Sequence, residues 1–333
     1  MIGKKLQQPI CIFLCFVIFL TILTSCTDTR EIKTSKSAFV LNTIATITIY
    51  GMTNEKILDE CFNLCRHYES LFSRTDENSE IYKLNARKIS VVSDETAELI
   101  SKGLYFSKLS GGKFDITIEP LSSLWNFSSD SPAVPEQSAI DDALRHVGYK
   151  SVTVSGNTVA FDDEYTRLDL GAIAKGYIAD KLKDYLISQG VEKAIINLGG
   201  NVLCIGGKTS SRGFEIGIQR PFGDGAIAAV SVSDMSVVTS GVYERYFSEN
   251  GKRYHHILNP KTGYPYENGL LSVTIVGKNS CDCDALSTLC FALGMDDGLQ
   301  LINSMDGFYA LFITDDYKLH FSEGAEKVLH AVY

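Results

Sequence analysis

The stretch AIINLGGNVLCIGG, residues 194–207, contains two short apolar runs, each of which ends in a pair of glycines. Runs of this length and composition are typical of β-strands, and glycine pairs mark the turns between them. Further runs of the same kind follow it along the chain, namely GFEIGIQ, AIAAVSVS, SVVTSGVYERYF, LLSVTIVG, FYALFIT and YKLHFSE. Strands are therefore predicted to dominate the second half of the chain.

Helices interrupt these strands without regular alternation. Hydrophobic periodicity and capping residues predict helices at about 54–71, 94–110, 138–147, 173–188 and 284–293. An alternating run at 39–51 and a hairpin that turns at Gly156-Asn157 predict strands in the first half as well. Because strands outnumber helices and are not regularly interleaved with them, we predict an α+β fold of mainly antiparallel sheets with flanking helices.

The first 25 residues differ in character from the rest. Lys4 and Lys5 precede an apolar stretch that is too short for a comfortable membrane span, as in a signal peptide. The stretch ends on Leu23-Thr24-Ser25-Cys26, which resembles the lipobox of bacterial lipoproteins, although a cysteine in an ordinary signal peptide is the alternative. Residues 26–37 are expected to form a polar tether. We therefore expect residues 38–333 to lie outside the cytoplasmic membrane, in the periplasm or at the cell membrane, anchored by acyl chains on Cys26.

Charge and cysteine content narrow the class of protein. The chain has 31 basic and 40 acidic residues, and the loss of residues 1–25 would remove two lysines and no acid. This acidic surplus argues against nucleic acid or an anionic membrane surface as the partner. Six of the nine cysteines follow Cys26, too few for a disulfide scaffold in a chain of this length. No linker inside 38–333 is long enough to separate independent domains, so we expect any two lobes to be fused.

The stretch RLDLGAIAKGYIADKL, residues 167–182, runs from a strand through a turn at Gly171 into a helix. Such a turn leaves free backbone N–H groups that suit a phosphate. Lys175 lies in the first helical turn, where a cation is unfavourable unless an anion lies nearby. The stretch matches neither a P-loop nor a dinucleotide-binding fingerprint. Phosphate binding and simple close packing at Gly171 and Gly176 both remain open.

The stretch RYHHILNPKTGYP, residues 253–265, combines two histidines with an ordered turn at Asn259-Pro260. Adjacent side chains of a strand point to opposite faces, so only one of His255 and His256 can face a site. A lone histidine on a strand is more often structural than catalytic. On its own the stretch leaves both roles open.

The stretch SCDCDALSTLC, residues 280–290, could hold zinc, a redox pair or a harder metal ion. Zinc sites use paired C-x-x-C elements or spaced histidines, and a redox site uses C-x-x-C; neither pattern is present. Asp284 and Thr288 are four residues apart, so their oxygens project from one face of the predicted helix. Oxygen ligands of this kind suit Mg²⁺. The alternative is that Asp284 caps the helix and Thr288 packs.

Taken together, the ordered motifs FDITIEPL, LDLGAIAKGYIAD, INLGGN, HILNPKTGYP and CDALST resemble those of the ApbE family, the FAD:protein FMN transferases. The similarity extends from about Phe39 to Tyr333. It implies an ApbE-like fold of two fused lobes and a Mg²⁺-dependent reaction that moves FMN from FAD onto a threonine or serine of an acceptor protein through a phosphodiester bond, releasing AMP. The implied acceptors are flavoproteins, such as subunits of sodium-pumping NADH:quinone or Rnf-type complexes.

The resemblance also assigns roles to individual residues. It implies flavin-site positions at Leu41, Thr75, Lys113, Phe114, Asp115, Asp169, Lys175, His256 and Ile257. It implies Mg²⁺ ligands at Ala172 and Cys281, through backbone carbonyls, and at Asp284 and Thr288, through side chains. His256 is the implied general base, and Asp284 the second catalytic residue. The chain departs from the family pattern where Leu41-Asn42 replaces Met-Gly, where Thr75 replaces an aromatic residue, and where Cys283 replaces alanine.

Two other functions are compatible with the same motifs. Water could replace the acceptor hydroxyl, which would make the protein a Mg²⁺-dependent FAD pyrophosphatase that yields FMN and AMP. A flavin-binding lipoprotein without catalysis belongs to another class of protein. The joint presence of Lys175, His256, Asp284 and Thr288 argues against that last alternative.

Overall fold

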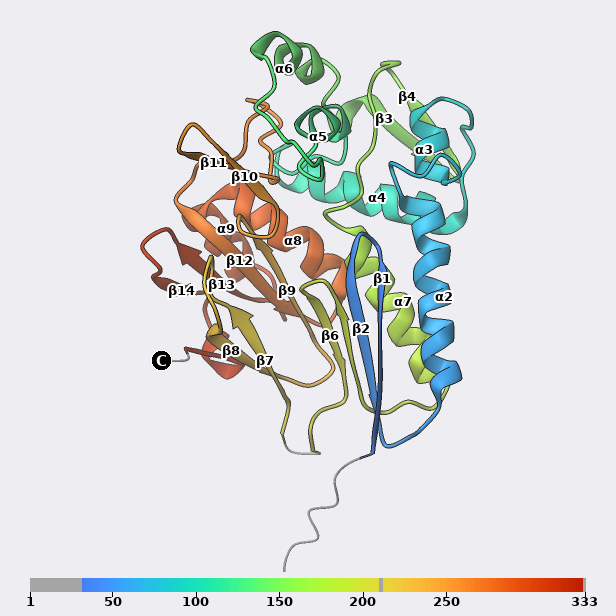
Figure 1. The fold of residues 1–333 in the computed structure, drawn as a ribbon, viewed down its shortest axis with the longest axis vertical. Coiled ribbons are helices and arrows are strands. Elements are labelled where there is room, and N and C mark those ends of the chain that lie inside the picture. Colours follow the sequence, from blue (N-terminus) through green and yellow to red (C-terminus); the bar gives the residue numbers. More distant parts are fainter. Residues whose placement is uncertain (1–31, 210–211, 332–333) are drawn as a thin grey trace, which may run out of the picture.

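The computed structural model describes residues 32–209 and 212–331 (Figure 1). The expected signal peptide and Cys26 lie outside these residues. Among the residues described, no helix is both long enough and apolar enough to cross a membrane.

An eight-stranded sheet forms the centre of the molecule. All neighbouring strands in it are antiparallel, and they follow the order β1-β2-β5-β6-β9-β12-β13-β14. These strands are β1 (Lys33–Val40), β2 (Thr43–Tyr50), β5 (Ala194–Leu198), β6 (Asn201–Ile205), β9 (Ser236–Gly241), β12 (Leu270–Gly277), β13 (Tyr309–Thr314) and β14 (Leu319–Phe321). The prediction of an α+β fold with mainly antiparallel sheets is confirmed.

The first strand begins earlier than expected. β1 starts at Lys33, inside the segment 26–37 that we expected to be a tether, and pairs with β2 along its whole length. Residues 33–37 of this strand are all polar, and the Ser35 and Ser37 hydroxyls hydrogen-bond those of Thr48 and Thr46. A polar edge strand of this kind shows no apolar alternation, which is why its sequence resembles a tether. Leu41 and Asn42, with φ of 55° and 56°, form the tight hairpin turn.

Helices cover one face of this sheet (Figure 1). α7 (Ala174–Ser188) and α8 (Ser280–Leu293) pack on its strands and on each other, and α2 (Glu55–Phe72) packs on α7. α8 begins at Ser280, four residues before the predicted start, because the Asn279 side chain accepts a hydrogen bond from the Asp282 N–H and caps the helix there. α3 (Glu80–Asn85), α4 (Asp94–Leu109) and α9 (Met295–Asn303) complete this layer.

Smaller units surround the central layers. The hairpin β3–β4 (Val152–Ser155, Thr158–Phe161) lies near α3 and α4. α5 (Glu119–Trp125), α6 (Gln137–Leu144) and the hairpin β10–β11 (Tyr246–Glu249, Lys252–His255) pack around Trp125 in a separate apolar cluster. A three-stranded antiparallel sheet, in the order β15-β8-β7, has its own apolar core against the main sheet. Its strands are β7 (Phe214–Gln219), β8 (Ala226–Val232) and β15 (Leu329–Ala331).

Candidate active site

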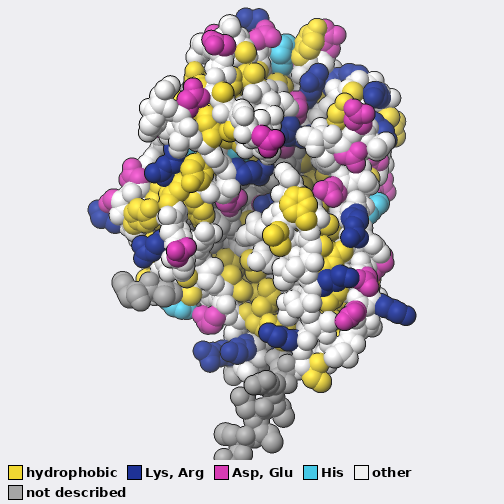
Figure 2. All heavy atoms as spheres, viewed as in Figure 1, with side chains coloured by type: hydrophobic (Ala, Val, Ile, Leu, Met, Phe, Trp, Pro, Cys, Tyr) yellow, Lys and Arg dark blue, Asp and Glu magenta, His cyan; other side chains and the backbone are white. Residues whose placement is uncertain are grey.

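A cleft of about 1230 Å³ opens on the face shown in Figure 2, where it appears as a hollow in the middle of the molecule. Its walls come from distant parts of the chain: the β1–β2 turn, the end of α2, the turn before α7, the loop after β9, the end of β11, and α8. Pockets for drug-sized ligands are typically about 300–1,000 Å³, so this cleft has room for a larger ligand. Every predicted site residue except Cys281 lines it.

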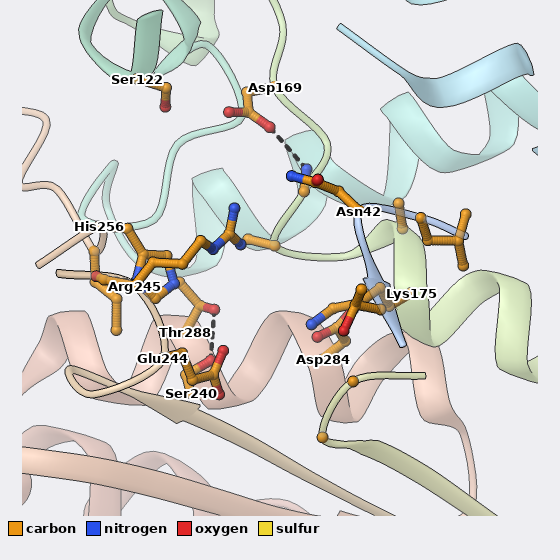
Figure 3. Close-up of a pocket in the computed structure, with 18 of the residues that line it drawn as sticks. Asn42, Ser122, Asp169, Lys175, Ser240, Glu244, Arg245, His256, Asp284 and Thr288 are labelled. Carbon is orange, nitrogen blue, oxygen red and sulfur yellow. Dashed lines mark hydrogen bonds between the residues drawn. The ribbon is translucent and has the colours of Figure 1, made fainter. Parts of the chain in front are cut away.

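Asp284 lies on α8 at the floor of the cleft and is 4% exposed. Its Oδ2 accepts a hydrogen bond of 2.9 Å from the backbone N–H of Gly176, at the start of α7. Burial raises the pKa of the Asp284 carboxyl, and the nearby Lys175 ammonium opposes that rise. Figure 3 shows the Lys175 and Asp284 side chains next to each other. The first turn of α7 therefore supplies both a cation and a backbone donor to this carboxylate.

The contact between α7 and α8 requires glycine at position 176. A Cβ atom there would lie 2.2 Å from the Ser280 carbonyl oxygen and 2.7 Å from the Cα of Cys281. Both atoms belong to the backbone of α8, so they can move away only if the two helices separate. The same glycine donates the hydrogen bond that holds Asp284.

We therefore expect Gly176→Ala to cost about 1–3 kcal/mol of unfolding free energy, the usual penalty of overpacking. Because the substitution also displaces Asp284, we expect catalytic activity to fall. Urea denaturation and an activity assay measure the two effects. Gly148→Ala is the matched control, since a Cβ at Gly148 meets nothing within 4 Å. Equal stability of the two variants would contradict the close approach.

Thr288 lies one helical turn beyond Asp284 and also faces the cleft. Its hydroxyl is 2.9 Å from that of Ser240, at the end of β9, and Ser240 is in turn 2.8 Å from the Ser287 hydroxyl. Ala172, before α7, lines the same part of the cleft. Cys281 does not line the cleft. The residue is 1% exposed, and its backbone N–H donates a hydrogen bond of 2.9 Å to Asp180 Oδ2. Its role as a metal ligand stays a prediction.

The donor atoms in this part of the cleft fit Mg²⁺. Among residues 32–209 and 212–331, no group of three or more His, Cys, Asp and Glu side chains is arranged to hold a metal ion. A metal held at Asp284 and Thr288 would therefore complete its shell with backbone, water or substrate oxygens. Mg²⁺ prefers that arrangement, whereas structural zinc requires four nitrogen or sulfur ligands.

His256 follows β11 on the opposite wall from Lys175 (Figure 3). Its Nδ1 is 3.3 Å from the Arg245 carbonyl oxygen, which also accepts the His256 backbone N–H at 3.1 Å. A proton on Nδ1 donates to this carbonyl and leaves Nε2 with a free lone pair. Burial, together with the charge of Arg245, holds the pKa of His256 well below its usual value. The imidazole is therefore neutral and able to accept a proton.

His255 points the other way, as the strand alternation predicted. Its ring packs on Phe291 with a centroid distance of 5.8 Å, and its Nε2 donates to the Tyr266 carbonyl oxygen at 2.9 Å. Its Nδ1 accepts the Ile257 N–H. His255 is thus a core residue that fixes the chain on either side of His256.

Asp169 and Arg74 form a polar group at the far end of the cleft. Arg74 Nε lies 3.1 Å from Asp169 Oδ2, and its guanidinium also donates to Ser123 at 2.9 Å. Asp169 Oδ1 accepts the Gly171 N–H at 2.9 Å. Asp169 is therefore held from two sides at the rim of the turn that leads to α7.

The remaining predicted flavin positions line this end and the mouth of the cleft. Phe114 is buried, whereas Thr75 is exposed. The Asp115 carboxylate accepts hydrogen bonds from the N–H groups of Thr117 and Tyr149, both at 2.8 Å, so it holds the local loop together. Leu41, Lys113 and Ile257 also contribute to the lining.

Sequence reasoning missed four charged residues of the cleft: Glu69, Arg74, Glu244 and Arg245. Glu244 and Arg245 lie in the loop between β9 and β10, and they extend into the cleft in Figure 3. Their stretch, SVVTSGVYERYF, reads as one strand, although the structure ends β9 at Gly241. Gly241 and the charged pair that follows it were the signals in the sequence that the strand had already ended.

Comparison with known proteins identifies the family. The sequence pattern of the ApbE family matches residues 41–312. The FAD:protein FMN transferase of Treponema pallidum is 35% identical over 314 residues, which cover 87% of each chain. That of Klebsiella pneumoniae is 37% identical over 287 residues, or 84% of this chain and 89% of the relative.

Comparison with solved structures identifies the same family. The ApbE protein from Thermotoga maritima superposes with a TM-score of 0.82 at 33% identity, over 89% of this chain and 99% of that one. The flavin transferase ApbE from Vibrio cholerae gives a TM-score of 0.80 at 26% identity, over 90% of this chain and 99% of that one. In sequence and in fold, the chain belongs to the ApbE family.

Proposed function

We propose that this protein transfers FMN from FAD to a threonine or serine hydroxyl of an acceptor protein, forming a phosphodiester bond and releasing AMP. The observation that carries the proposal is the pairing, in one cleft, of a neutral histidine, His256, with two oxygen-bearing side chains, the buried Asp284 and the half-buried Thr288. The first group suits removal of a hydroxyl proton, and the second suits a hard metal ion. The names of the curated relatives support the same reaction.

Cationic groups of the cleft are positioned for a pyrophosphate. Lys175 and Arg245 line opposite sides of the space above Asp284 and Thr288 (Figure 3). Neither side chain has a hydrogen-bond or ion-pair partner among the described residues, so both are available to phosphate oxygens. Asp284, Thr288 and the Ala172 carbonyl would hold Mg²⁺, which supplies charge neutralisation at the pyrophosphate when bound. Pre-positioned charges of this kind stabilise the transition state of phosphoryl transfer.

His256 acts on the acceptor. Its Nε2 accepts the proton of the acceptor hydroxyl while Nδ1 donates to the Arg245 carbonyl. The hydroxyl oxygen attacks the FMN phosphorus and forms the new P–O bond. The bond from that phosphorus to the bridging oxygen breaks, and AMP leaves with the bridging oxygen. The role of the protein is to hold the attacking oxygen and the leaving group in line.

We further propose that the protein works outside the cytoplasmic membrane, attached to it by acyl chains on Cys26. The signal-like residues 1–25 and the following cysteine support this location. Flavoprotein subunits of sodium-pumping NADH:quinone or Rnf-type complexes are the proposed acceptors, because their modified domains would share that compartment.

The test uses residues 27–333 with FAD, Mg²⁺ and a purified flavoprotein subunit of a sodium-pumping NADH:quinone complex. Intact mass reports modification of the acceptor, and AMP is quantified in parallel. We expect the acceptor to gain one FMN phosphodiester for each AMP released. The alternative result is that AMP and free FMN are released while the acceptor stays unmodified. If the same result is obtained with an Rnf-type subunit, the protein is a pyrophosphatase. FAD that is bound but recovered intact would identify a flavin-binding protein.

A further inference from the structure

β7 presents a free edge to the cleft. It is the last strand of the sheet β15-β8-β7 and, among residues 32–209 and 212–331, pairs only with β8. Four consecutive residues of it, 216–219, line the same cleft as His256. Side chains of a strand alternate between its faces, so a cleft lined by consecutive residues meets the backbone edge of the strand rather than one face. An unpaired edge of this kind is a template for another strand.

The hydrogen bonds of β8 show which backbone groups lie on that edge. The Ser231 N–H donates to the Val328 carbonyl at 2.8 Å, away from β7 and toward β15. The backbone N–H and C=O groups of its neighbours in β8 must point toward β7, because these groups alternate in direction from one residue of a strand to the next. Val230 and Val232 therefore form backbone hydrogen bonds with their partners in β7, Ile216 and Phe214.

The residues of β7 between these partners point outward. By the same alternation, Glu215 and Gly217 direct their N–H and C=O groups to the free edge. No other hydrogen bond reaches either backbone within the part of the chain that the structure describes. Gly217 also carries no side chain that could shield the edge from a ligand.

The wall opposite β7 is apolar and exposed. Phe39 and Ile44 are cross-strand partners beside the β1–β2 turn, and they are 72% and 67% exposed. Phe39 lines the cleft. The two side chains lie next to each other, and adjacent exposed apolar side chains at the mouth of a cleft are a feature of protein interaction sites. Figure 2 shows hydrophobic side chains along the hollow in this region.

The free edge leads to the catalytic histidine. Beyond the end of β7, the ring of Phe222 packs on that of Tyr243 with a centroid distance of 6.1 Å. Tyr243 lies two residues before Arg245, whose carbonyl oxygen holds His256. A chain laid along β7 would therefore approach His256 at the Gln219 end of the strand.

We propose that the target segment of the acceptor protein binds as an extended strand along the free edge of β7, opposite Phe39 and Ile44, with its target hydroxyl at the Gln219 end. This proposal rests on the proposed transferase function and names the way in which that site takes its protein substrate. Strand addition draws its affinity from main-chain hydrogen bonds and so tolerates varied sequences. The apolar wall would receive one side chain of the bound segment.

Gly217→Pro tests the proposal, with Gly217→Ala as its matched control. Both variants place a Cβ atom 3.3 Å from that of Ala226, but only proline removes the outward N–H. The backbone hydrogen bonds from Ile216 and Ile218 to β8 remain in both variants, because proline is tolerated where the N–H faces away from the partner strand.

We expect kcat/KM for the acceptor subunit of the sodium-pumping complex to fall about tenfold in Gly217→Pro and to change little in Gly217→Ala. FAD affinity, measured by flavin fluorescence, should stay at the wild-type value in both. Equal transfer by the two variants would overturn the proposal. Absence of transfer by the wild-type protein, with FAD bound, would instead overturn the transferase function.

Hydrogen exchange provides a second measurement that needs no variant of this protein. The probe is the same acceptor subunit with alanine in place of its target hydroxyl residue, added without FAD. We expect exchange to slow in the peptide that spans 214–219. Unchanged exchange there while the subunit binds would contradict strand addition. A wild-type dimer that is lost in the Gly217→Pro variant would also contradict the proposal, because the free edge of β7 would then pair two copies of this chain instead of binding the acceptor.

Discussion

The Asp284→Asn variant is expected to release AMP from FAD about 100 to 1,000 times more slowly than the wild-type protein. The substitution keeps the size of the side chain and an oxygen that can accept the Gly176 N–H, but it removes the negative charge. In the proposed mechanism this charge would hold Mg²⁺, and the charge neutralisation that the metal supplies would be worth several kcal/mol of transition-state stabilisation. AMP release, measured with FAD and Mg²⁺ at saturation, gives the rate.

Asp282→Asn is the matched control, because it makes the same chemical change on the same helix. Asp282 lies outside the cleft lining and pairs with Lys102 at 2.8 Å. We expect a near wild-type rate for this control. Binding of Mn²⁺, followed by electron paramagnetic resonance, should weaken in Asp284→Asn and not in Asp282→Asn. An unchanged rate in Asp284→Asn would remove this carboxylate from the mechanism.

The His256→Asn variant is expected to transfer FMN about 10² to 10⁴ times more slowly, which is the usual contribution of a general base. The amide nitrogen of asparagine takes the place of Nδ1 and can still donate to the Arg245 carbonyl, so the loop and the binding of FAD should be retained. Intact mass of the acceptor gives the transfer rate, and flavin fluorescence gives the affinity for FAD. A loss of FAD binding with no separate effect on the rate would make His256 a binding residue instead.

His255→Gln provides the contrast from the adjacent position. His255 is buried, donates a hydrogen bond from one ring nitrogen and accepts one at the other, so we expect lower stability with intact transfer chemistry.

The pH dependence of the transfer rate tests the protonation state of His256. Because the pKa of His256 lies well below its usual value, the base stays unprotonated and transfer by the wild-type protein should remain level as the pH falls through about 6.5. The rate should decline only in more acidic solution, where His256 takes up a proton.

Several features of the site follow from short-range geometry and were predictable for that reason. Asp284 and Thr288 share a face because they are four apart on a helix, and His255 and His256 diverge because they are adjacent on an extended chain. The unfavourable place of Lys175 in the first turn of α7 is explained by the buried Asp284 carboxylate beside it. The first two inferences needed only the local conformation, whereas the anion beside Lys175 lies on a distant part of the chain and was not identified from the sequence.

Features that depend on distant contacts were not predictable. Arg74 becomes part of the cleft through its pairing with Asp169, which lies far along the chain. α5 was missed because its sequence, EPLSSLW, is short, and its apolar residues pack in the cluster around Trp125. β1 was missed over residues 33–37 because an exposed edge strand needs no apolar pattern when its partner strand supplies the pairing.

The strand order of the main sheet makes folding depend on parts of the chain that are synthesised at very different times. β2 ends at Tyr50, yet its second neighbour, β5, begins only at Ala194. A growing chain therefore carries an unpaired edge of β2 until most of the protein has left the ribosome, and such edges promote aggregation. Long-range pairing of this kind also slows folding, and we expect refolding on a scale of about milliseconds to seconds rather than microseconds. Cells that make this protein would benefit from a chaperone that shields the early hairpin during that interval.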